Sequence, residues 1–231
     1  QVVNDAVVSA FGSAGQRCSA LRVLFIQKDV YPRFKKLLQG AMAELSIGLP
    51  EFLSSDVGPV IDDEAAQNLK AHAKNMKDNY TLIAECELPE SCKHGHFVAP
   101  IAIEIPSLQV LEKEEFGPIL HVITFEAEAL ENVVEQINQS GYGLTLGVQS
   151  RIQETVDYIR KHAHVANCYV NRNMIGAVVG LQPFGGEGLS GTGPKAGGPM
   201  YLPRLCHERT FTVDTTAAGG NASLMSLSDE E

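Results

Sequence analysis

The chain has 231 residues, of which 44% are hydrophobic and 20% charged, the balance of a globular protein that buries a substantial core. Its formal net charge of −10 argues against contact with nucleic acid, and no apolar run reaches the ~20 residues that would span a bilayer. Five cysteines without a repeating framework indicate free thiols in a reducing compartment.

Helix-like and strand-like hydrophobic patterns alternate along the chain. A helical pattern opens at Gln1 with no cap before it, so we expect a chain cut from a longer protein. The alternation predicts an α/β fold with a mainly parallel sheet flanked by helices. Further helices are predicted over residues 31–45, 62–77 (capped by Asp62), 128–139 and 152–162, and strands over 21–27, 81–84, 101–105, 119–125, 144–149 and 165–170.

Cys18 lies at the junction of a predicted helix and a predicted strand, in the run GSAGQRCSA of residues 12–20. A thiol at such a junction is accessible, and Arg17 directly before it favours the thiolate, the form that attacks carbon. The small neighbouring residues leave room for a substrate. The alternative is a buried structural cysteine, which packs as a small apolar residue.

A second candidate is the turn EEFGP at residues 114–118, between two predicted strands. Its Gly-Pro step enforces a turn, which would present Phe116 at a strand edge. An exposed ring beside the Glu114 carboxylate suits a nucleotide, since the ring stacks on a heterocycle while the carboxylate accepts hydrogen bonds from ribose hydroxyls. The alternative is an acidic turn whose Phe belongs to the core.

Residues 176–198 form a glycine-rich stretch without a collagen-like period, which predicts a long functional loop. Its run QPFGG at residues 182–186 would let the backbone approach a ligand, and backbone N–H groups can hold a carboxylate. Beyond this loop, Thr210–Val213 has a strand-like pattern and is followed by a small-residue tail.

Other catalytic and metal motifs are weak. The spacing C-x5-C-x-H-x-H of Cys86, Cys92, His94 and His96 does not match the usual zinc sites, so we expect a polar loop and no metal. The sequence has no G-x-S-x-G elbow of a serine hydrolase, no G-x-G-x-x-G fingerprint and no P-loop.

Taken in order, GQRC (residues 15–18), ExFGP (114–118) and PFGG (183–186) followed by Ser190-Gly191 resemble the motifs of the aldehyde dehydrogenase superfamily. The resemblance is closest to the L-glutamate γ-semialdehyde (1-pyrroline-5-carboxylate) dehydrogenase branch, and within it to the bifunctional proline utilisation A proteins of bacteria. It is carried by residues 2–20, 176–186, 190–199 and 208–221, and it covers essentially the whole chain.

The resemblance implies that Cys18 is the catalytic nucleophile. Its thiolate would add to the aldehyde, a hydride would leave for NAD⁺, and the thioester that remains would be hydrolysed to glutamate. The Cys18 backbone N–H would hold part of the oxyanion. Ser19, with the backbone of Gly176 and Ala177, would anchor the amino acid end of glutamate semialdehyde, and Phe184 would pack on its aliphatic stem.

In the same family terms, Glu114 binds the nicotinamide ribose and Phe116 contacts that end of the cofactor. The family's general-base Glu, the side-chain amide of its oxyanion hole and its Rossmann-type NAD-binding domain all precede the nucleophile and are absent from this chain. We therefore expect a fragment that is inactive without upstream residues. FAD is implied only if an upstream proline dehydrogenase domain exists.

The resemblance also implies a domain plan, with residues 1–200 as the nucleophile-bearing catalytic domain and 201–231 as an oligomerisation strand and flexible tail. The partners would be the upstream proline dehydrogenase and NAD-binding domains and a second copy in a homodimer. The location would be the bacterial cytoplasm or the periphery of the inner membrane. Two other functions stay open: an aldehyde dehydrogenase of different substrate specificity, and a non-catalytic remnant or interaction module.

Overall fold

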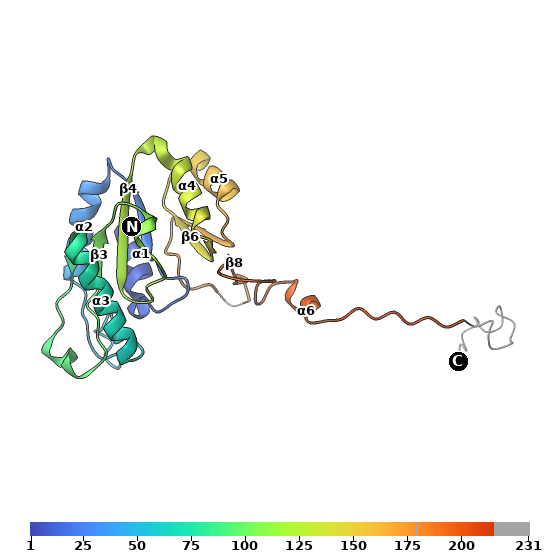
Figure 1. The fold of residues 1–231 in the computed structure, drawn as a ribbon, viewed down its shortest axis with the longest axis horizontal. Helices are drawn as coiled ribbons and strands as arrows, with labels where there is room; N and C mark the ends of the chain where they lie inside the picture. The colour runs from blue at the N-terminus through green and yellow to red at the C-terminus, as the bar shows by residue number, and fades with distance from the viewer. Residues whose placement is uncertain (179, 215–231) are drawn as a thin grey trace. The chain divides into compact units, whose positions relative to one another are not determined.

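The computed structural model describes residues 1–178 and 180–214, and Figure 1 labels its α-helices and several of its strands. Two compact units divide the chain, Gln1–Gly198 and Pro199–Glu231, and each is described by itself. All strands that the described residues form belong to the first unit.

A four-stranded sheet in the order β1–β4–β3–β2 forms the centre of the first unit (Figure 1). β1 (Val23–Gln27), β4 (Ile119–Phe125) and β3 (Ile101–Glu104) run parallel, and β2 (Thr81–Glu85) pairs with β3 antiparallel. The first five residues of β4 are all buried, as expected of a central strand covered on both faces. The prediction of a mainly parallel sheet with flanking helices is confirmed.

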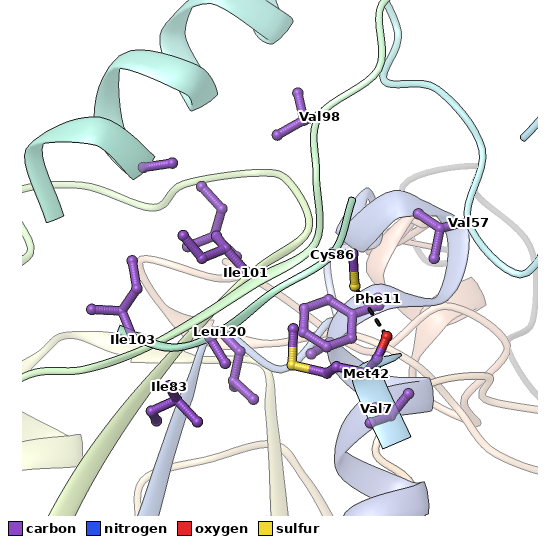
Figure 2. Close-up of a cluster of buried hydrophobic side chains, with 14 of the residues drawn as sticks. Val7, Phe11, Met42, Val57, Ile83, Cys86, Val98, Ile101, Ile103 and Leu120 are labelled. Carbon is purple, nitrogen blue, oxygen red and sulfur yellow. Dashed lines mark hydrogen bonds between the residues drawn. The ribbon is translucent and has the colours of Figure 1, made fainter. Parts of the chain in front are cut away.

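Three helices pack with this sheet: α1 (Val2–Phe11), α2 (Tyr31–Ala43) and α3 (Asp63–Asn79). The predicted cap of α3 is present, because Asp62 Oδ1 accepts a hydrogen bond from the Ala65 N–H at 2.8 Å. Phe11, Met42 and Leu120 are among the fully buried side chains that join helices and sheet (Figure 2). Burial of these apolar faces, which the sequence periodicity anticipates, holds the layers together.

A smaller layer follows in the same unit. β6 (Thr145–Val148) pairs in parallel with β7 (Asn167–Val170), next to α4 (Leu130–Gln139) and α5 (Gln153–His162). Val134, Val148 and Ile159 form its own hydrophobic cluster. The short strands β5 (Tyr142–Gly143) and β8 (Glu187–Gly188) pair antiparallel, which draws the glycine-rich loop onto this layer.

The predicted elements of the first unit are confirmed to within a few residues at each end. The periodicity does not reveal the 3₁₀ helices, because a single tight turn has no repeating apolar face. These are η1 (Gly12–Gly15), η2 (Glu90–His94), η3 (Leu108–Val110) and η4 (Ala127–Ala129).

The described part of the second unit contains one short helix, α6 (Tyr201–Arg204). The prediction of a strand at Thr210–Val213 is wrong for this structure: residues 205–214 form no helix or strand. A strand needs a neighbour for its backbone hydrogen bonds, and no described segment pairs with this one. The tail beyond residue 214 lies outside the described residues. No described helix is long and apolar enough to cross a membrane.

Candidate active site

The backbone before Cys18 makes a sharp left-handed turn. Ser13 (φ 56°), Ala14 (φ 53°) and Gly15 (φ 65°) follow one another in a region that side chains other than glycine rarely adopt. At Gly15 a Cβ atom would lie 2.1 Å from the Gly117 carbonyl oxygen, so only glycine fits. This contact brings the segment that leads to the thiol against the EFGP turn, about a hundred residues later in the chain.

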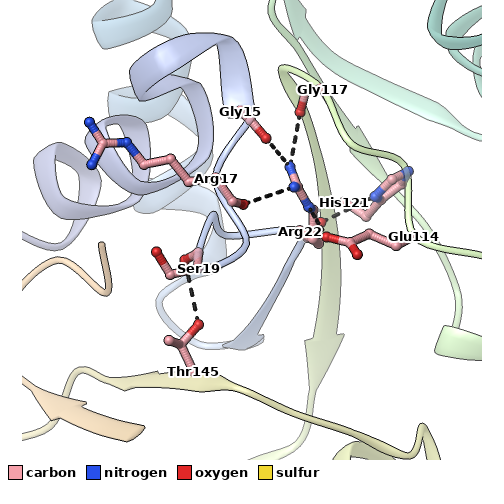
Figure 3. Close-up of polar contacts among 8 residues, drawn as sticks. All are labelled: Gly15, Arg17, Ser19, Arg22, Glu114, Gly117, His121 and Thr145. Carbon is pink, nitrogen blue, oxygen red and sulfur yellow. Dashed lines mark hydrogen bonds and ion pairs between the residues drawn. The ribbon is translucent and has the colours of Figure 1, made fainter. Parts of the chain in front are cut away.

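Cys18 is exposed at the end of this turn, just ahead of β1, whereas its neighbour Ser19 is buried. The segment is held from two sides. The Leu21 N–H donates to the Ser9 carbonyl on α1 at 2.9 Å, and the Ser19 carbonyl accepts from Thr145 Oγ1 on β6 at 3.4 Å (Figure 3). An accessible thiol on an anchored backbone is the arrangement that a nucleophile requires.

Arg22 joins the segment around Cys18, residues 12–22, to the EFGP turn at residues 115–118. Its guanidinium donates to the backbone carbonyls of Gly15, of Arg17 at 3.1 Å and of Gly117 at 3.3 Å, and its Nε donates to Glu114 Oε1 at 3.1 Å (Figure 3). The side chain is only 16% exposed. A planar guanidinium with five donors can cross-link several acceptors at once.

Phe116 stacks on the same guanidinium, with Arg22 Cζ 4.6 Å from the ring centroid. The ring remains 45% exposed, and the Glu114 carboxylate is also accessible. An accessible carboxylate and a partly exposed aromatic ring therefore lie together beside one cation. The cofactor role that the family resemblance implies for these two residues stays a prediction.

Sequence reasoning missed Arg22 and assigned the cation beside the thiol to Arg17. In the structure the Arg17 Nε donates to Ser13 Oγ at 3.0 Å, and Arg22 is the cation that interacts electrostatically with Cys18. Burial lowers the pKa of Arg22, while Glu114 and Cys18 raise it, and an arginine keeps its charge under these conditions. The sequence signal that could have identified Arg22 is its position as a lone cation directly before the apolar strand β1.

The glycine-rich loop begins close to α1. The Met174 N–H donates to Ser9 Oγ at 3.2 Å, and a Cβ atom on Gly12 would lie 3.5 Å from Ile175 Cδ1. The next residues are Gly176, at φ 74°, and Ala177. Within the described residues no hydrogen bond uses the N–H groups of these two. Free donors on a loop are suited to a carboxylate ligand.

Phe184 lies further along this loop and is half-buried. Its backbone pairs with Ala196 in both directions, at 3.1 and 2.9 Å, which closes the loop. Asn167 Nδ2 on β7 donates to the Gly185 carbonyl at 2.8 Å, and Lys195 Nζ donates to Asn167 Oδ1 at 2.9 Å. No described hydrogen bond or aromatic contact joins Phe184 to the other predicted site residues.

The Cys86 and Cys92 thiols are buried and donate to the backbone carbonyls of Met42 and Ile47 at 3.2 and 3.8 Å. Burial raises the pKa of Cys86 to about 11, which disfavours the thiolate that a metal would need. Among the described residues no group of three acidic, His or Cys side chains could hold a metal ion.

Comparison with known proteins gives concordant results. The model of the "Aldehyde dehydrogenase family" matches residues 1–211. The chain is 54% identical over 222 residues to the bifunctional protein PutA of Salmonella typhimurium. The matched region covers 94% of this chain and 17% of that protein. The chain thus spans about a sixth of the length of this relative.

Solved structures agree. A mutant of Bradyrhizobium japonicum proline utilization A superposes with a TM-score of 0.88 at 54% identity, over 94% of this chain and 22% of that one. A 1-pyrroline-5-carboxylate dehydrogenase from Thermus, solved with bound NAD, superposes with a TM-score of 0.79 at 35% identity, over 87% of this chain and 39% of that one.

Proposed function

This chain belongs to the aldehyde dehydrogenase family, and we propose that it is the nucleophile-bearing part of an NAD-dependent L-glutamate γ-semialdehyde dehydrogenase. The observation that carries the proposal is the Arg22 cluster, in which an accessible thiol segment and a cofactor-type turn are cross-linked by one cation. The names of the similar proteins support the choice of substrate.

In the proposed reaction the Cys18 thiolate attacks the aldehyde carbon and forms a thiohemiacetal, and the Arg22 cation interacts electrostatically with Cys18. The Cys18 backbone N–H would donate to the oxygen that becomes an oxyanion. Loss of a hydride leaves a thioester on Cys18, and water cleaves the thioester to glutamate and the free thiol.

Substrate recognition is assigned to the glycine-rich loop. The free N–H groups of Gly176 and Ala177 would donate to the α-carboxylate, with Ser19 beside the nucleophile as a further contact. Phe184 would cover the aliphatic part of the substrate. Neutral backbone donors bind a carboxylate without placing a second cation near the thiolate.

The cofactor proposal uses Glu114 and Phe116. The Glu114 carboxylate would accept from the nicotinamide ribose, and the exposed face of Phe116 would lie against the same end of the cofactor. Bound NAD⁺ supplies a hydride acceptor there. Arg22 orients both side chains before the cofactor arrives.

The remaining machinery is proposed to lie in other parts of a longer protein. Asp5, the carboxylate that precedes Cys18 in this sequence, already accepts a hydrogen bond from Gln149 Nε2 at 3.1 Å. The base, the rest of the NAD site, a proline dehydrogenase domain with FAD and a homodimer contact near residues 201–231 belong to this proposal, with residues 1–200 as the catalytic domain. We place the enzyme in the bacterial cytoplasm.

The test uses the native protein that carries this sequence. Cys18→Ala should lower NADH formation from glutamate semialdehyde at least ~1,000-fold, because the covalent route is removed. Cys168→Ala, at another exposed cysteine, is the matched control and should retain activity. Activity that survives Cys18→Ala would refute the proposed nucleophile and favour the non-catalytic interpretation.

A second variant tests the substrate. Glutamate should compete with the semialdehyde, and Ala177→Phe should abolish this competition while sparing simple aliphatic aldehydes, since it fills the carboxylate site. Val178→Phe, at the exposed next position, should leave competition intact. If simple aldehydes outperform the semialdehyde in the native protein, the function is an aldehyde dehydrogenase of different specificity.

A further inference from the structure

A pair of histidines lies beneath the Arg22 cluster and has no part in the proposed chemistry. His121, on β4, is 2% exposed, and its Nδ1 is 3.1 Å from the Arg22 carbonyl oxygen (Figure 3). Its Nε2 is 3.0 Å from Nε2 of His72, on α3. The two rings meet edge to face, with centroids 5.2 Å apart. Through these contacts, helix α3 is connected by His121 on β4 to the backbone of Arg22.

The partners of these rings determine where their protons lie. A backbone carbonyl only accepts, so His121 Nδ1 must carry a hydrogen and donate to Arg22. In neutral His121 the Nε2 is then an acceptor, so the hydrogen between the two rings belongs to His72 Nε2. When His72 is neutral as well, its Nδ1 has a lone pair and no hydrogen.

That lone pair faces a carboxylate. His72 Nδ1 is 3.5 Å from Glu115 Oε1, and both side chains are about a tenth exposed, at 12% and 10%. Two acceptors face each other in a nearly dry site, which is unfavourable unless one more proton is bound. Lys113 Nζ, 3.9 Å from the same Glu115 oxygen, is the competing partner of the carboxylate.

We propose that His72 and Glu115 bind one exchangeable proton whose presence positions the neighbouring Glu114–Gly117 turn for the cofactor. With the proton, the hydrogen-bonded line from Glu115 through His72 and His121 to Arg22 is complete. Without it, Lys113 is the ionic partner left to the Glu115 side chain among the described residues. His72, His121 and Glu115 are thus positioning residues that act through Glu114 and Arg22. This inference depends on the proposed NAD-dependent function.

The charges that face the pair define the direction of the pH dependence. Burial lowers the pKa of His72, as does Lys113, while Glu115 raises it. Burial also lowers the pKa of His121 to about 4, with further lowering by His72 and Arg22, so His121 stays neutral. The shared proton is therefore bound below the ordinary histidine range and lost above it. Because the pKa of His72 is lowered overall, cofactor binding should tighten as the pH falls below about 6.

The experiment measures NADH binding to the native protein by calorimetry and by fluorescence, at pH values from about 5 to about 8. We expect the dissociation constant to be about fivefold lower at the acidic end, the net effect of about one hydrogen bond. Titrations in two buffers of different ionisation enthalpy should show uptake of a fraction of a proton on binding. A purely structural role of His72 would produce no proton uptake.

Two variants with opposite expectations make the test specific. Glu115→Gln should bind tightly at every pH without proton uptake, because its amide donates to His72 Nδ1 permanently. His72→Leu should stay at the weak, alkaline value, and Glu115→Gln still decides the matter if His72→Leu folds poorly. His96→Gln is the matched control, since His96 pairs with Asp63 in an exposed position and should behave as the native protein.

The outcomes separate the two proposals. An unchanged pH dependence and proton uptake in Glu115→Gln would overturn this inference and leave the proposed function standing. Failure of the native protein to bind NADH at any pH would overturn the proposed function and this inference with it. Loss of the pH dependence in His96→Gln would assign the proton to the exposed pair and would also overturn the inference.

Discussion

The nucleophile segment, residues 12–22, and the glycine-rich loop, residues 176–198, are both rich in small residues but are held differently. Arg22 ties the first to the Glu114 turn through three backbone carbonyls, a carboxylate and an aromatic ring. The second follows Met174, whose N–H bonds to Ser9 on α1, and its later part is held by the β5–β8 pairing and by the bond of Lys195 to Asn167 on β7. At its start, no hydrogen bond within the described residues uses the N–H groups of Gly176 and Ala177.

The difference fits the two tasks in the proposed function. A nucleophile must meet the carbon and the hydride acceptor in a defined geometry, and the Cys18 segment is cross-linked by Arg22 to the proposed cofactor turn. A substrate carboxylate needs donors that are not already used, and no described hydrogen bond uses the N–H groups of Gly176 and Ala177.

The largest effect is expected from Arg22→Met, which removes the cross-link of the first region. Partly buried carbonyls and the Glu114 carboxylate lose their donor, so we expect about 2–3 kcal/mol less stability and at least ~100-fold lower kcat/KM in the native protein. Urea denaturation and steady-state kinetics measure the two. Arg33→Met, on the exposed face of α2, should behave as wild type; equal losses in both variants would refute the special role of Arg22.

Substituting glycines compares the two regions directly. Gly15→Ala places a Cβ 2.1 Å from the Gly117 oxygen at a left-handed φ, and should cost about 3 kcal/mol. Gly176→Ala has the same φ penalty but open space, and should cost about 1 kcal/mol. Gly193→Ala, with neither constraint, should be close to neutral. Similar denaturation midpoints for all three variants would remove the distinction between the regions.

The dependence of stability on acid pH tests His121, the buried histidine in contact with the Arg22 backbone. The pKa of His121 is lowered from 6.5 to about 4, so between these values the unfolded chain binds a proton that the folded chain excludes. The free energy of unfolding should therefore fall as the pH drops through this window, by up to about 3 kcal/mol. His121→Leu should flatten the fall in urea titrations at about pH 7 and about pH 4.5. The exposed His94→Leu should not.

The smallest effect concerns thiol reactivity in the two regions. Cys18 interacts with the Arg22 cation, whereas burial raises the pKa of Cys168, beside the loop anchor Asn167, although Arg160 opposes it. Iodoacetamide should therefore modify Cys18 about tenfold faster than Cys168 near neutral pH, as followed by peptide mass spectrometry. Cys86, which is buried, should react most slowly. Equal rates at Cys18 and Cys168 would contradict an activated nucleophile.

The helices and strands of the first unit could be predicted from local sequence pattern. The two wrong predictions, a strand at Thr210–Val213 and Arg17 as the cation beside the thiol, both concern contacts that local sequence does not contain. Apolar periodicity located the helices and strands of the first unit, and Asp62 marked the start of α3. The strand at Thr210–Val213 failed because strand formation needs a partner that local sequence does not supply. Arg17 was chosen over Arg22 because proximity along the chain is not proximity in space.

By itself the sequence determined the order of helices and strands, the exposed thiol candidate and the motifs that resemble a known family, because these depend on residue type and short-range spacing. Only the tertiary structure decided that Arg22 meets Glu114, 92 residues away, and that His72 meets His121, 49 residues away. Such contacts depend on how the sheet and α3 pack. A lone Arg and two isolated His are thus brought together with the Glu114 turn once the chain has folded.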